Sequence, residues 1–473
     1  MGYEAVIGLE VHAELSTKSK IFCGCSTRFG AEPNTQVCPV CTGMPGSLPV
    51  FNRAVAEYAI RAGVALGCEI SPLTKFDRKN YFYPDLPKAY QVSQLYLPIC
   101  RDGCLEIEVD GKKKRIGIRE IHMEEDAGKL VHDGEGTLID YNRGGVPLIE
   151  IVSQPDLGSA DEVIAYLEKL RETLLYLDVC DCKMQEGSLR ADINLSVRPA
   201  GSAVLGIRTE MKNMNSLKAI HRAIGYETAR QIELLDRGGA VEQETRRWDD
   251  DKGVSTGLRS KENAQDYRYF PEPDLLPLQI DAGWIARIRA EMPEIPEQKR
   301  ARYTGEMGLS PYDAALLTTS KPLSDLFEGA AAISKKPKET ANLILVEVMR
   351  LLNDGGGSPD DLRLDAEKLA AIVNLIGEGV INRSAGRAAL EALFKHGTDP
   401  QAYIREHGLA MTQDTGLIES AVEKALAENP KSVEDYRAGK EKAFGFLVGQ
   451  TMKALGGKGD PQMVNRLLRE KLK

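Results

Sequence analysis

Several signatures of common protein classes are missing from this chain of 473 residues. No window approaches the ~18 consecutive apolar residues of a membrane-spanning helix, so we expect none. The Walker A phosphate loop is absent, no G-x-G-x-x-G follows a predicted strand, and no strand–turn–helix segment carries a serine-hydrolase elbow. A nucleotide bound by this chain would therefore depend on carboxylate-held metal and scattered basic groups.

An excess of positive charge is also missing, because 61 Lys and Arg face 70 Asp and Glu and leave a net charge of −9. This balance argues against a general nucleic-acid-binding protein. The charge is uneven, however: residues 431–473 carry ten basic and five acidic side chains, or +5, which leaves −14 for the rest. An acidic body with a basic end favours a polyanionic partner at that end, although an ordinary basic terminal helix explains the charge equally well.

Four segments combine apolar residues with acids in patterns that predict strands of one sheet. At the N-terminus, apolar residues alternate with Glu10, His12 and Glu14, and a period of two places these three on one face of a half-buried strand. The alternation recurs over 189–198 and 207–212, while 146–152 is too apolar for a free loop. The charged positions of these later segments are Glu150, Arg190, Asp192, Arg198, Arg208, Glu210 and Lys212.

Residues 119–129 add a dense group of acids and one imidazole. Its members are Glu120, His122, Glu124, Glu125 and Asp126. Carboxylates with an imidazole suit Mg²⁺ or Mn²⁺, and interleaved Arg and Lys suit phosphate oxygens. Together the polar faces predict a metal–nucleotide site on an open antiparallel sheet. The alternative is that each face is only solvated, because spacing alone does not show that the faces converge.

The nine cysteines are used unevenly. Cys23 and Cys25 are followed, after twelve residues, by Cys38 and Cys41. A C-x-C and a C-x₂-C pair at this separation predict a tetrahedral zinc site, which is structural because protein ligands fill all four positions. The alternative is four unrelated thiols. An odd cysteine count without a secretory signal predicts a reducing, cytoplasmic location.

A loop at 78–91 brings aromatic residues and lysines together. Lys79 and Lys88 flank a segment that contains two prolines, two tyrosines and a phenylalanine. Such a loop is able to stack on a base and meet phosphates, but aromatic residues in a proline-rich loop more often pack against their own domain.

The pattern changes near residue 293, where strands give way to helices. Before that point, amphipathic helices are predicted at 52–66, 159–177 and 216–237. A second boundary near 407 precedes a compact helical end. We therefore expect an α+β protein with a strand-rich domain at 1–293, a helical domain at 294–407 and a small helical tail at 408–473.

Long motifs give this chain a resemblance that covers essentially its whole length. They are Ile7-Gly-Leu-Glu-Val-His-Ala-Glu-Leu15, Lys79-Asn-Tyr-Phe-Tyr-Pro-Asp-Leu-Pro-Lys88, His122-Met-Glu-Glu-Asp-Ala-Gly-Lys129, Asp140-Tyr-Asn-Arg-Gly-Gly-Val-Pro-Leu-Ile-Glu150 and Asp266-Tyr-Arg-Tyr-Phe-Pro271. With these motifs the chain resembles the B subunits of bacterial glutamyl/aspartyl-tRNA amidotransferases.

The resemblance implies an antiparallel-sheet cradle domain with a zinc knuckle at 23–41, then an all-α helical domain and a tRNA-binding tail. It implies a heterotrimer with an A subunit that releases ammonia from glutamine and a small C subunit. The expected substrates are Glu-tRNA(Gln), Asp-tRNA(Asn) or both. ATP activates the side-chain carboxylate, and ammonia then displaces phosphate.

The residue assignments follow from this resemblance together with the acid-bearing strands. The expected Mg²⁺ ligands are Glu10, His12, Glu125 and Glu150, with Glu124, Asp192 and Glu210 as a second metal site or its surroundings. The expected ATP-binding residues are Arg190, Arg208, Lys79 and Lys88, and the expected tRNA contacts are Lys440, Lys442 and Lys453. Some members lack the four cysteines, which implies a structural role for the zinc.

Two rival hypotheses remain open at this stage. The first is a tRNA-binding adaptor without chemistry, which would lack ATP turnover and metal dependence. The second is an independent ligase that produces its own ammonia, and the absence of an amidase or glutaminase nucleophile motif speaks against it.

Overall fold

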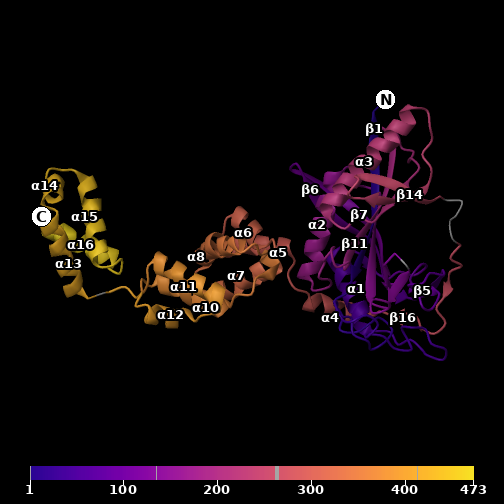
Figure 1. The fold of residues 1–473 in the computed structure, drawn as a ribbon, viewed down its shortest axis with the longest axis horizontal. Helices are drawn as coiled ribbons and strands as arrows, with labels where there is room; N and C mark the ends of the chain where they lie inside the picture. The colour runs from indigo at the N-terminus through magenta and orange to yellow at the C-terminus, as the bar shows by residue number, and fades with distance from the viewer. Residues whose placement is uncertain (1, 135, 261–265, 413, 473) are drawn as a thin grey trace. The chain divides into compact units, whose positions relative to one another are not determined.

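The computed structural model describes residues 2–134, 136–260, 266–412 and 414–472, and the chain divides into two compact units, Met1–Ile295 and Pro296–Lys473. The first unit combines sheets with helices, and every regular element in the described part of the second is helical (Figure 1). The expected α+β class is therefore confirmed.

A nine-stranded sheet organises the first unit, in the order β14-β13-β12-β11-β1-β10-β7-β6-β2. Neighbouring strands are antiparallel except for β12 and β13, which are parallel, so the sheet is mixed where a purely antiparallel one was expected. The strands are β1 (Tyr3–Glu14), β2 (Glu69–Ile70), β6 (Cys100–Val109), β7 (Lys112–Glu125), β10 (Pro147–Ser153), β11 (Leu189–Pro199), β12 (Thr209–Lys212), β13 (Glu244–Asp249) and β14 (Val254–Ser260).

Alternation gives the sheet one apolar and one polar face. In β1, Leu9 and Val11 are buried, whereas Glu10 and His12 are half-buried. Helices cover the apolar face: α1 packs against β6 and β7, α2 against β6, and α3 against β11. The polar face is left for a site.

Side-chain caps set where these three helices begin. Asn52 accepts a hydrogen bond from the backbone N–H of Ala54, and Ser159 and Ser216 cap the next two helices in the same way. The helices of this unit are α1 (Arg53–Ala65), α2 (Ala160–Tyr176), α3 (Leu217–Asp236) and α4 (Ala282–Glu291).

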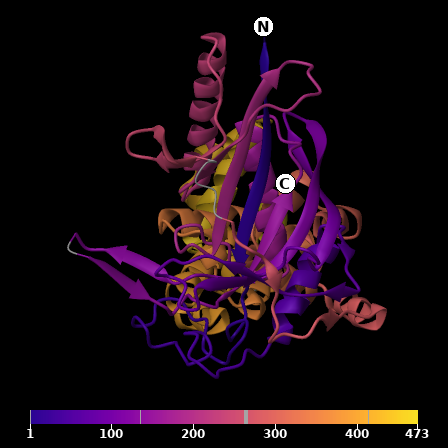
Figure 2. The same cartoon turned by 90° about the vertical axis from the view of Figure 1, so that its right-hand side faces the viewer.

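Smaller sheets complete the first unit. A three-stranded sheet contains β15 (Phe270–Pro271), β4 (Asp77–Asn80) and β5 (Tyr90–Ser93), and a two-stranded sheet pairs β16 (Leu278–Gln279) with β3 (Leu73–Thr74). The hairpin of β8 (Lys129–His132) and β9 (Thr137–Asp140) projects away from the rest of this unit (Figure 2).

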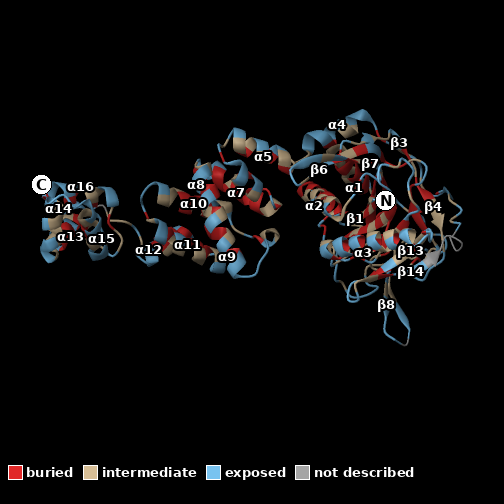
Figure 3. Ribbon diagram, turned by 90° about the horizontal axis from the view of Figure 1, so that it is seen from above, coloured by how far each residue is buried: buried red, intermediate tan, exposed pale blue. Residues whose placement is uncertain are grey.

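The second unit contains two separate hydrophobic clusters, one between Tyr303 and Ile404 and one between Ile418 and Leu472. Buried residues alternate with exposed ones along its helices (Figure 3). The elements of the first cluster's segment are α5 (Pro296–Gly305), α6 (Pro311–Leu317), α7 (Lys321–Ser334), α8 (Pro337–Asn342), the π-helix η2 (Leu343–Val348), α9 (Met349–Asp354), the 3₁₀ helix η3 (Pro359–Asp361), α10 (Ala366–Gly377), α11 (Arg383–His396) and α12 (Pro400–Glu406). Those of the second are α13 (Thr415–Glu428), α14 (Pro430–Arg437), α15 (Glu441–Ala454) and α16 (Pro461–Leu472).

Within the described residues, no helix combines the length and the apolar character that crossing a membrane requires.

Candidate functional site

Three adjacent strands bring an imidazole and two carboxylates together on the polar face. His12 of β1 lies opposite Glu150 of β10, and Glu150 lies opposite His122 of β7. The Nε2 atom of His12 is 3.4 Å from Glu150 Oε2 and 3.6 Å from Glu124 Oε1. Because one ligand atom from each of His12, Glu124 and Glu150 lies within 4.8 Å of the others, this His12 group has the geometry of a metal site.

A second imidazole completes the charge balance of the His12 group. The Nε2 atom of His122 lies 2.9 Å from Glu150 Oε2. Burial alone would raise the pKa of Glu150, but His122 and His12 hold it well below its usual range. Burial opposes the charged form of His122, yet Glu150 and Glu124 raise its pKa to about 9. The histidines thus favour ionised carboxylates, the form that binds a cation.

A second group of acids lies on the neighbouring strands. Glu10 is opposite Asp192, and the ligand atoms of Glu10, Asp192 and Glu210 lie within 4.8 Å of one another. The ammonium of Lys212 pairs with Asp192 and lies 2.9 Å from Glu210 Oε1. Burial raises the pKa of Glu10, and the carboxylate of Glu150 raises it further. An added cation would therefore stabilise the ionised form of the Glu10 carboxylate.

An Arg–carboxylate cluster closes the same face at the end of β1. Arg190 Nη2 donates to Asp126 Oδ2 at 2.7 Å, and Arg143 Nε lies 3.5 Å from the same oxygen. The Nε atom of Arg190 is buried and has no hydrogen-bond partner among the described residues. Arg190 thus lies beside the floor, by which we mean the polar face bearing the His12 and Glu10 groups.

The structure does not bring Glu125 to the His12 group. Successive side chains of β7 alternate between faces, so Glu124 reaches His12 whereas Glu125 pairs with Lys88 and accepts from the backbone N–H of Val92 at 2.8 Å. Both Glu125 and Lys88 line a cavity of about 160 Å³, together with Lys20 and Cys41.

The remaining expected phosphate-binding residues lie in different places. Lys79 is half-buried on β4, and its ammonium lies 5.0 Å from the centre of the Tyr267 ring. Arg208 is exposed and precedes β12, so it is not on the polar face of a strand as its alternation suggested. Lys440, Lys442 and Lys453 are all exposed in the second unit.

The expected metal ligands and phosphate-binding residues did not include four residues of this floor: His122, Asp126, Arg143 and Lys212. For two of them a signal was present. His122 shares parity with Glu124, and Lys212 shares parity with Glu210, so each pair had to lie on one face. Arg143 and Asp126 come from loops whose positions depend on tertiary contacts.

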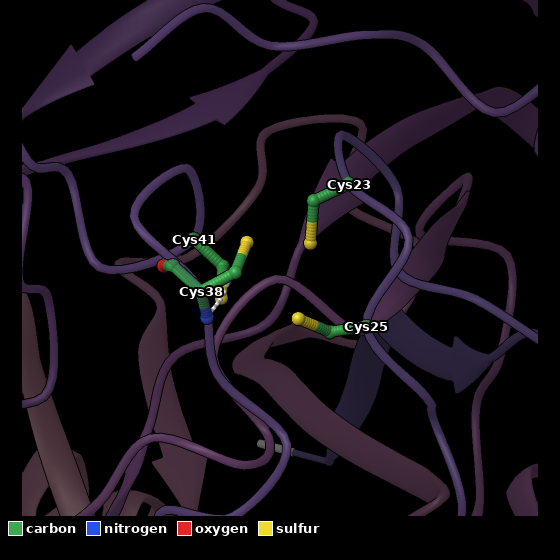
Figure 4. Close-up of side chains that lie close together, drawn as sticks. All are labelled: Cys23, Cys25, Cys38 and Cys41. Atoms are coloured by element: carbon green, nitrogen blue, oxygen red, sulfur yellow. Dashed lines mark hydrogen bonds between the residues drawn. The ribbon is translucent and has the colours of Figure 1, made fainter. Parts of the chain in front are cut away.

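The four cysteines of the predicted knuckle converge, with their sulfur atoms turned toward one another (Figure 4). Their ligand atoms all lie within 4.8 Å of one another, which fits a tetrahedral zinc site. A hydrogen bond from the Cys23 thiol, with smaller contributions from the Cys38 backbone and the Lys20 charge, lowers the pKa of Cys41 to about 4 despite burial. The Lys20 ammonium is fully buried, 3.6 Å from Cys41 Sγ.

Comparison with known proteins supports the catalytic assignment of this unit. A family model described as the GatB/GatE catalytic domain matches residues 5–286, and one described as the GatB domain matches 325–472. The B subunit of the aspartyl/glutamyl-tRNA(Asn/Gln) amidotransferase of Lachnoclostridium phytofermentans is 61% identical over 472 residues, which cover 99% of both chains. The chain belongs to this family of amidotransferase B subunits.

Other members of the family are similar over the same length. The B subunit from Caldicellulosiruptor bescii is 56% identical over 100% of this chain and 99% of its own, and that from Caldanaerobacter subterraneus subsp. tengcongensis is 55% identical over the whole of both. The catalytic-domain match includes every residue of the floor and the zinc knuckle, and the GatB-domain match includes the exposed tail lysines.

Proposed function

We propose that this chain is the subunit of a tRNA-dependent amidotransferase that activates and amidates the amino acid. In this proposal, ATP activates the side-chain carboxylate of Glu-tRNA(Gln) or Asp-tRNA(Asn), and ammonia from a glutaminase subunit completes the reaction. The observation that carries it is the convergence of the His12 and Glu10 groups on one floor of a domain matched by a catalytic-domain model.

The chemistry requires positioning more than covalent help. A substrate carboxylate oxygen attacks the γ-phosphorus, the bond to ADP breaks, and ammonia then attacks the activated carbonyl carbon and displaces phosphate. Bound Mg²⁺ would neutralise charge on the phosphate oxygens. His12, Glu124 and Glu150 would hold one ion and Glu10, Asp192 and Glu210 a second, because each set offers converging ligands.

Basic residues at the rim of the floor fit the anionic substrates. Arg190 donates from Nη2 to Asp126, and its Nε has no hydrogen-bond partner among the described residues. This nitrogen is therefore suited to donate to a phosphate or carboxylate oxygen of a substrate. Lys212 forms ion pairs with Asp192 and Glu210, and a bound cation would replace its ammonium beside these carboxylates. These contacts orient the reacting groups in the proposed mechanism.

The proposal includes partners that the chain itself does not supply. We propose a cytoplasmic heterotrimer with an amidase A subunit and a small C subunit, a structural Zn²⁺ at Cys23, Cys25, Cys38 and Cys41, and a tail that grips the tRNA backbone. The basic end of the chain and its exposed lysines support the tRNA contact.

A reconstituted three-subunit complex tests the central claim. Supplied with ammonium chloride, ATP and Glu-tRNA(Gln), the wild type should form Gln-tRNA. We expect Glu150→Gln and His12→Ala to lower this rate by at least about 100-fold while glutamine hydrolysis, assayed separately, persists. Unchanged amidation would mean that the floor is a scaffold. If the wild-type complex bound Glu-tRNA(Gln) but did not hydrolyse ATP, the adaptor hypothesis would be favoured.

A further inference from the structure

Two segments far apart in the sequence lie side by side next to the floor. Strands β4 and β15 pair, with Phe270 opposite Arg78. Beyond this pair, the backbone N–H of Asn80 donates to the Tyr267 carbonyl at 3.0 Å, and its side-chain amide donates to the Arg268 carbonyl at 2.9 Å. These bonds fix the residues that follow Asn80 relative to those that precede Phe270.

Three tyrosines meet where these segments join. The Tyr81 and Tyr267 rings are 5.9 Å apart and edge-on, and the Tyr267 and Tyr269 rings are 6.0 Å apart in the same arrangement. Lys79 places its ammonium 5.8 Å from the centre of the Tyr81 ring and 5.0 Å from that of Tyr267. All four side chains are half-buried, so part of their surface remains accessible.

The backbone between two of these tyrosines is strained. Arg268 has a φ of 44°, in the left-handed region that non-glycine residues seldom adopt. Its side chain is 82% exposed and lies 3.8 Å from Asp266, so burial does not explain the conformation. Strain of this kind persists where the surrounding structure fixes it, and it concentrates at binding and catalytic sites.

Strand β5 joins the tyrosine segment to the His12 group: Lys79 on β4 lies opposite Gln91 on β5, and Ser93 of β5 donates its hydroxyl to Glu124 Oε2 at 3.3 Å. Burial raises the pKa of Tyr81 and Tyr269, and the Glu124 carboxylate raises both further. Glu150 also raises the pKa of Tyr269. The segment that carries the tyrosines is therefore joined to the His12 group through a single strand.

We infer that Tyr81, Tyr267 and Lys79 form an adenine-binding wall beside the floor. The inference rests on the proposed function, since that reaction brings two adenine-bearing ligands to the floor, ATP and the 3′-terminal adenosine of the aminoacyl-tRNA. A flat base gains from stacking on tyrosine, and the Lys79 ammonium suits the phosphate that accompanies either adenine. Tyr269 packs edge-on against the ring of Tyr267.

Leucine and phenylalanine variants test the wall in the reconstituted complex. Tyr267→Leu and Tyr81→Leu remove the aromatic face, whereas Tyr267→Phe and Tyr81→Phe keep it. Tyr96→Leu is the matched control, because Tyr96 is also partly exposed and has a lysine ammonium, that of Lys75, 4.9 Å from its ring centre. Thermal melting of each variant verifies folding before kinetics are measured.

Two arms distinguish the sources of the adenine. In the first, KM for ATP is measured at saturating Glu-tRNA(Gln); in the second, KM for Glu-tRNA(Gln) is measured at saturating ATP. We expect the leucine variants to raise one KM by at least about fivefold, with the phenylalanine variants and Tyr96→Leu near wild type. The arm that responds identifies the ligand.

Altered ligands test the wall on the wild-type complex, so that this test does not depend on whether the variants fold. Ribose 5-triphosphate, which lacks the base, should inhibit the ATP reaction more weakly than ADP does if the wall holds ATP, and tRNA ending in cytidine should show a raised KM if it holds the terminal adenosine. The adenine-binding wall would be refuted if every leucine variant kept the wild-type KM values, ribose 5-triphosphate inhibited as strongly as ADP, and tRNA ending in cytidine kept the wild-type KM. Failure of the wild type to amidate would instead refute the proposed function.

Discussion

Glu124 and Glu125 are adjacent in the sequence and occupy opposite environments. Glu124 lies on the floor with His12, and Glu125 pairs with Lys88 in the cavity that Cys23 and Cys41 also line. The Glu125 carboxylate is held by the Lys88 ammonium and the backbone N–H of Val92, whereas an oxygen of Glu124 lies within reach of His12 and Glu150. The single-residue step along β7 therefore separates two chemical roles.

Exchanging each acid for its amide measures that separation. We expect Glu124→Gln to weaken Mg²⁺ binding by about 10- to 100-fold, since it removes a carboxylate oxygen from the His12 group. Glu125→Gln should leave Mg²⁺ affinity unchanged, because its side chain lies on the other face. Isothermal titration of each variant with MgCl₂ provides the measurement. Equal losses would return Glu125 to the ligand set.

The carboxyl of Glu14 predicts a pH dependence of stability. Burial, followed by the nearby Asp126 carboxylate, raises the pKa of Glu14 to about 8. In the unfolded chain this pKa is ~4.3, so the folded state binds more protons between these values and loses stability as pH rises through this window. We expect Glu14→Gln, which cannot ionise, to lose less thermal stability than wild type between pH 5 and pH 8. Parallel melting curves would contradict this.

At the scale of elements, the sequence predicts helix starts and strand faces better than it predicts which strands pair. Asn52, Ser159 and Ser216 cap helices at the positions that the sequence indicated, because an N-cap acts within its own turn. Alternation likewise places Glu10 and His12 on one face. The parallel pairing of β12 with β13, and the meeting of Tyr81 with Tyr267, depend on long-range contacts that no local pattern encodes.

The zinc knuckle is an element whose structure we expect to depend on metal. Between β1 and α1 the described chain forms no regular strand or helix, so a metal held by the four cysteines would add links that secondary structure does not supply there. Cys38→Ser should abolish the single equivalent of bound zinc and lower the melting temperature of the first unit by about 5 °C. Cys68→Ser, outside the cluster, should do neither. Elemental analysis and calorimetry measure both, and full zinc retention by Cys38→Ser would refute the site.

Helix α15 contains two glycines that lower its stability, and no close packing within the described chain requires them. A Cβ added at Gly445 or Gly449 would meet nothing within 4 Å, and both residues are exposed beside Lys442 and Lys453. Glycine in a helix costs about 1 kcal/mol relative to alanine, so both alanine variants should stabilise the protein. If these positions admit close approach of a tRNA backbone, the same variants should weaken tRNA binding. Filter binding and melting curves test the two effects separately.

For the whole molecule, the separation of charge implies separate tasks. The acidic first unit contains the carboxylate floor, whereas residues 431–473 carry a charge of +5. The tail that contains these residues has a hydrophobic cluster of its own. In the proposed enzyme, amino-acid chemistry and tRNA grip are thus assigned to different parts of one chain. Changes in the tail should then alter substrate affinity and leave the chemical step intact.

A tail variant with three exposed lysines replaced tests this division. In Lys440→Gln/Lys442→Gln/Lys453→Gln we expect KM for Glu-tRNA(Gln) to rise by about tenfold or more with kcat unchanged. Each lost phosphate contact should reduce the slope of log affinity against log salt by about 1, because fewer counterions are released. Lys424→Gln on α13 is the control, since that lysine is also exposed but lies on another helix of the tail. A fall in kcat at unchanged KM would place these lysines in the chemistry instead of the grip.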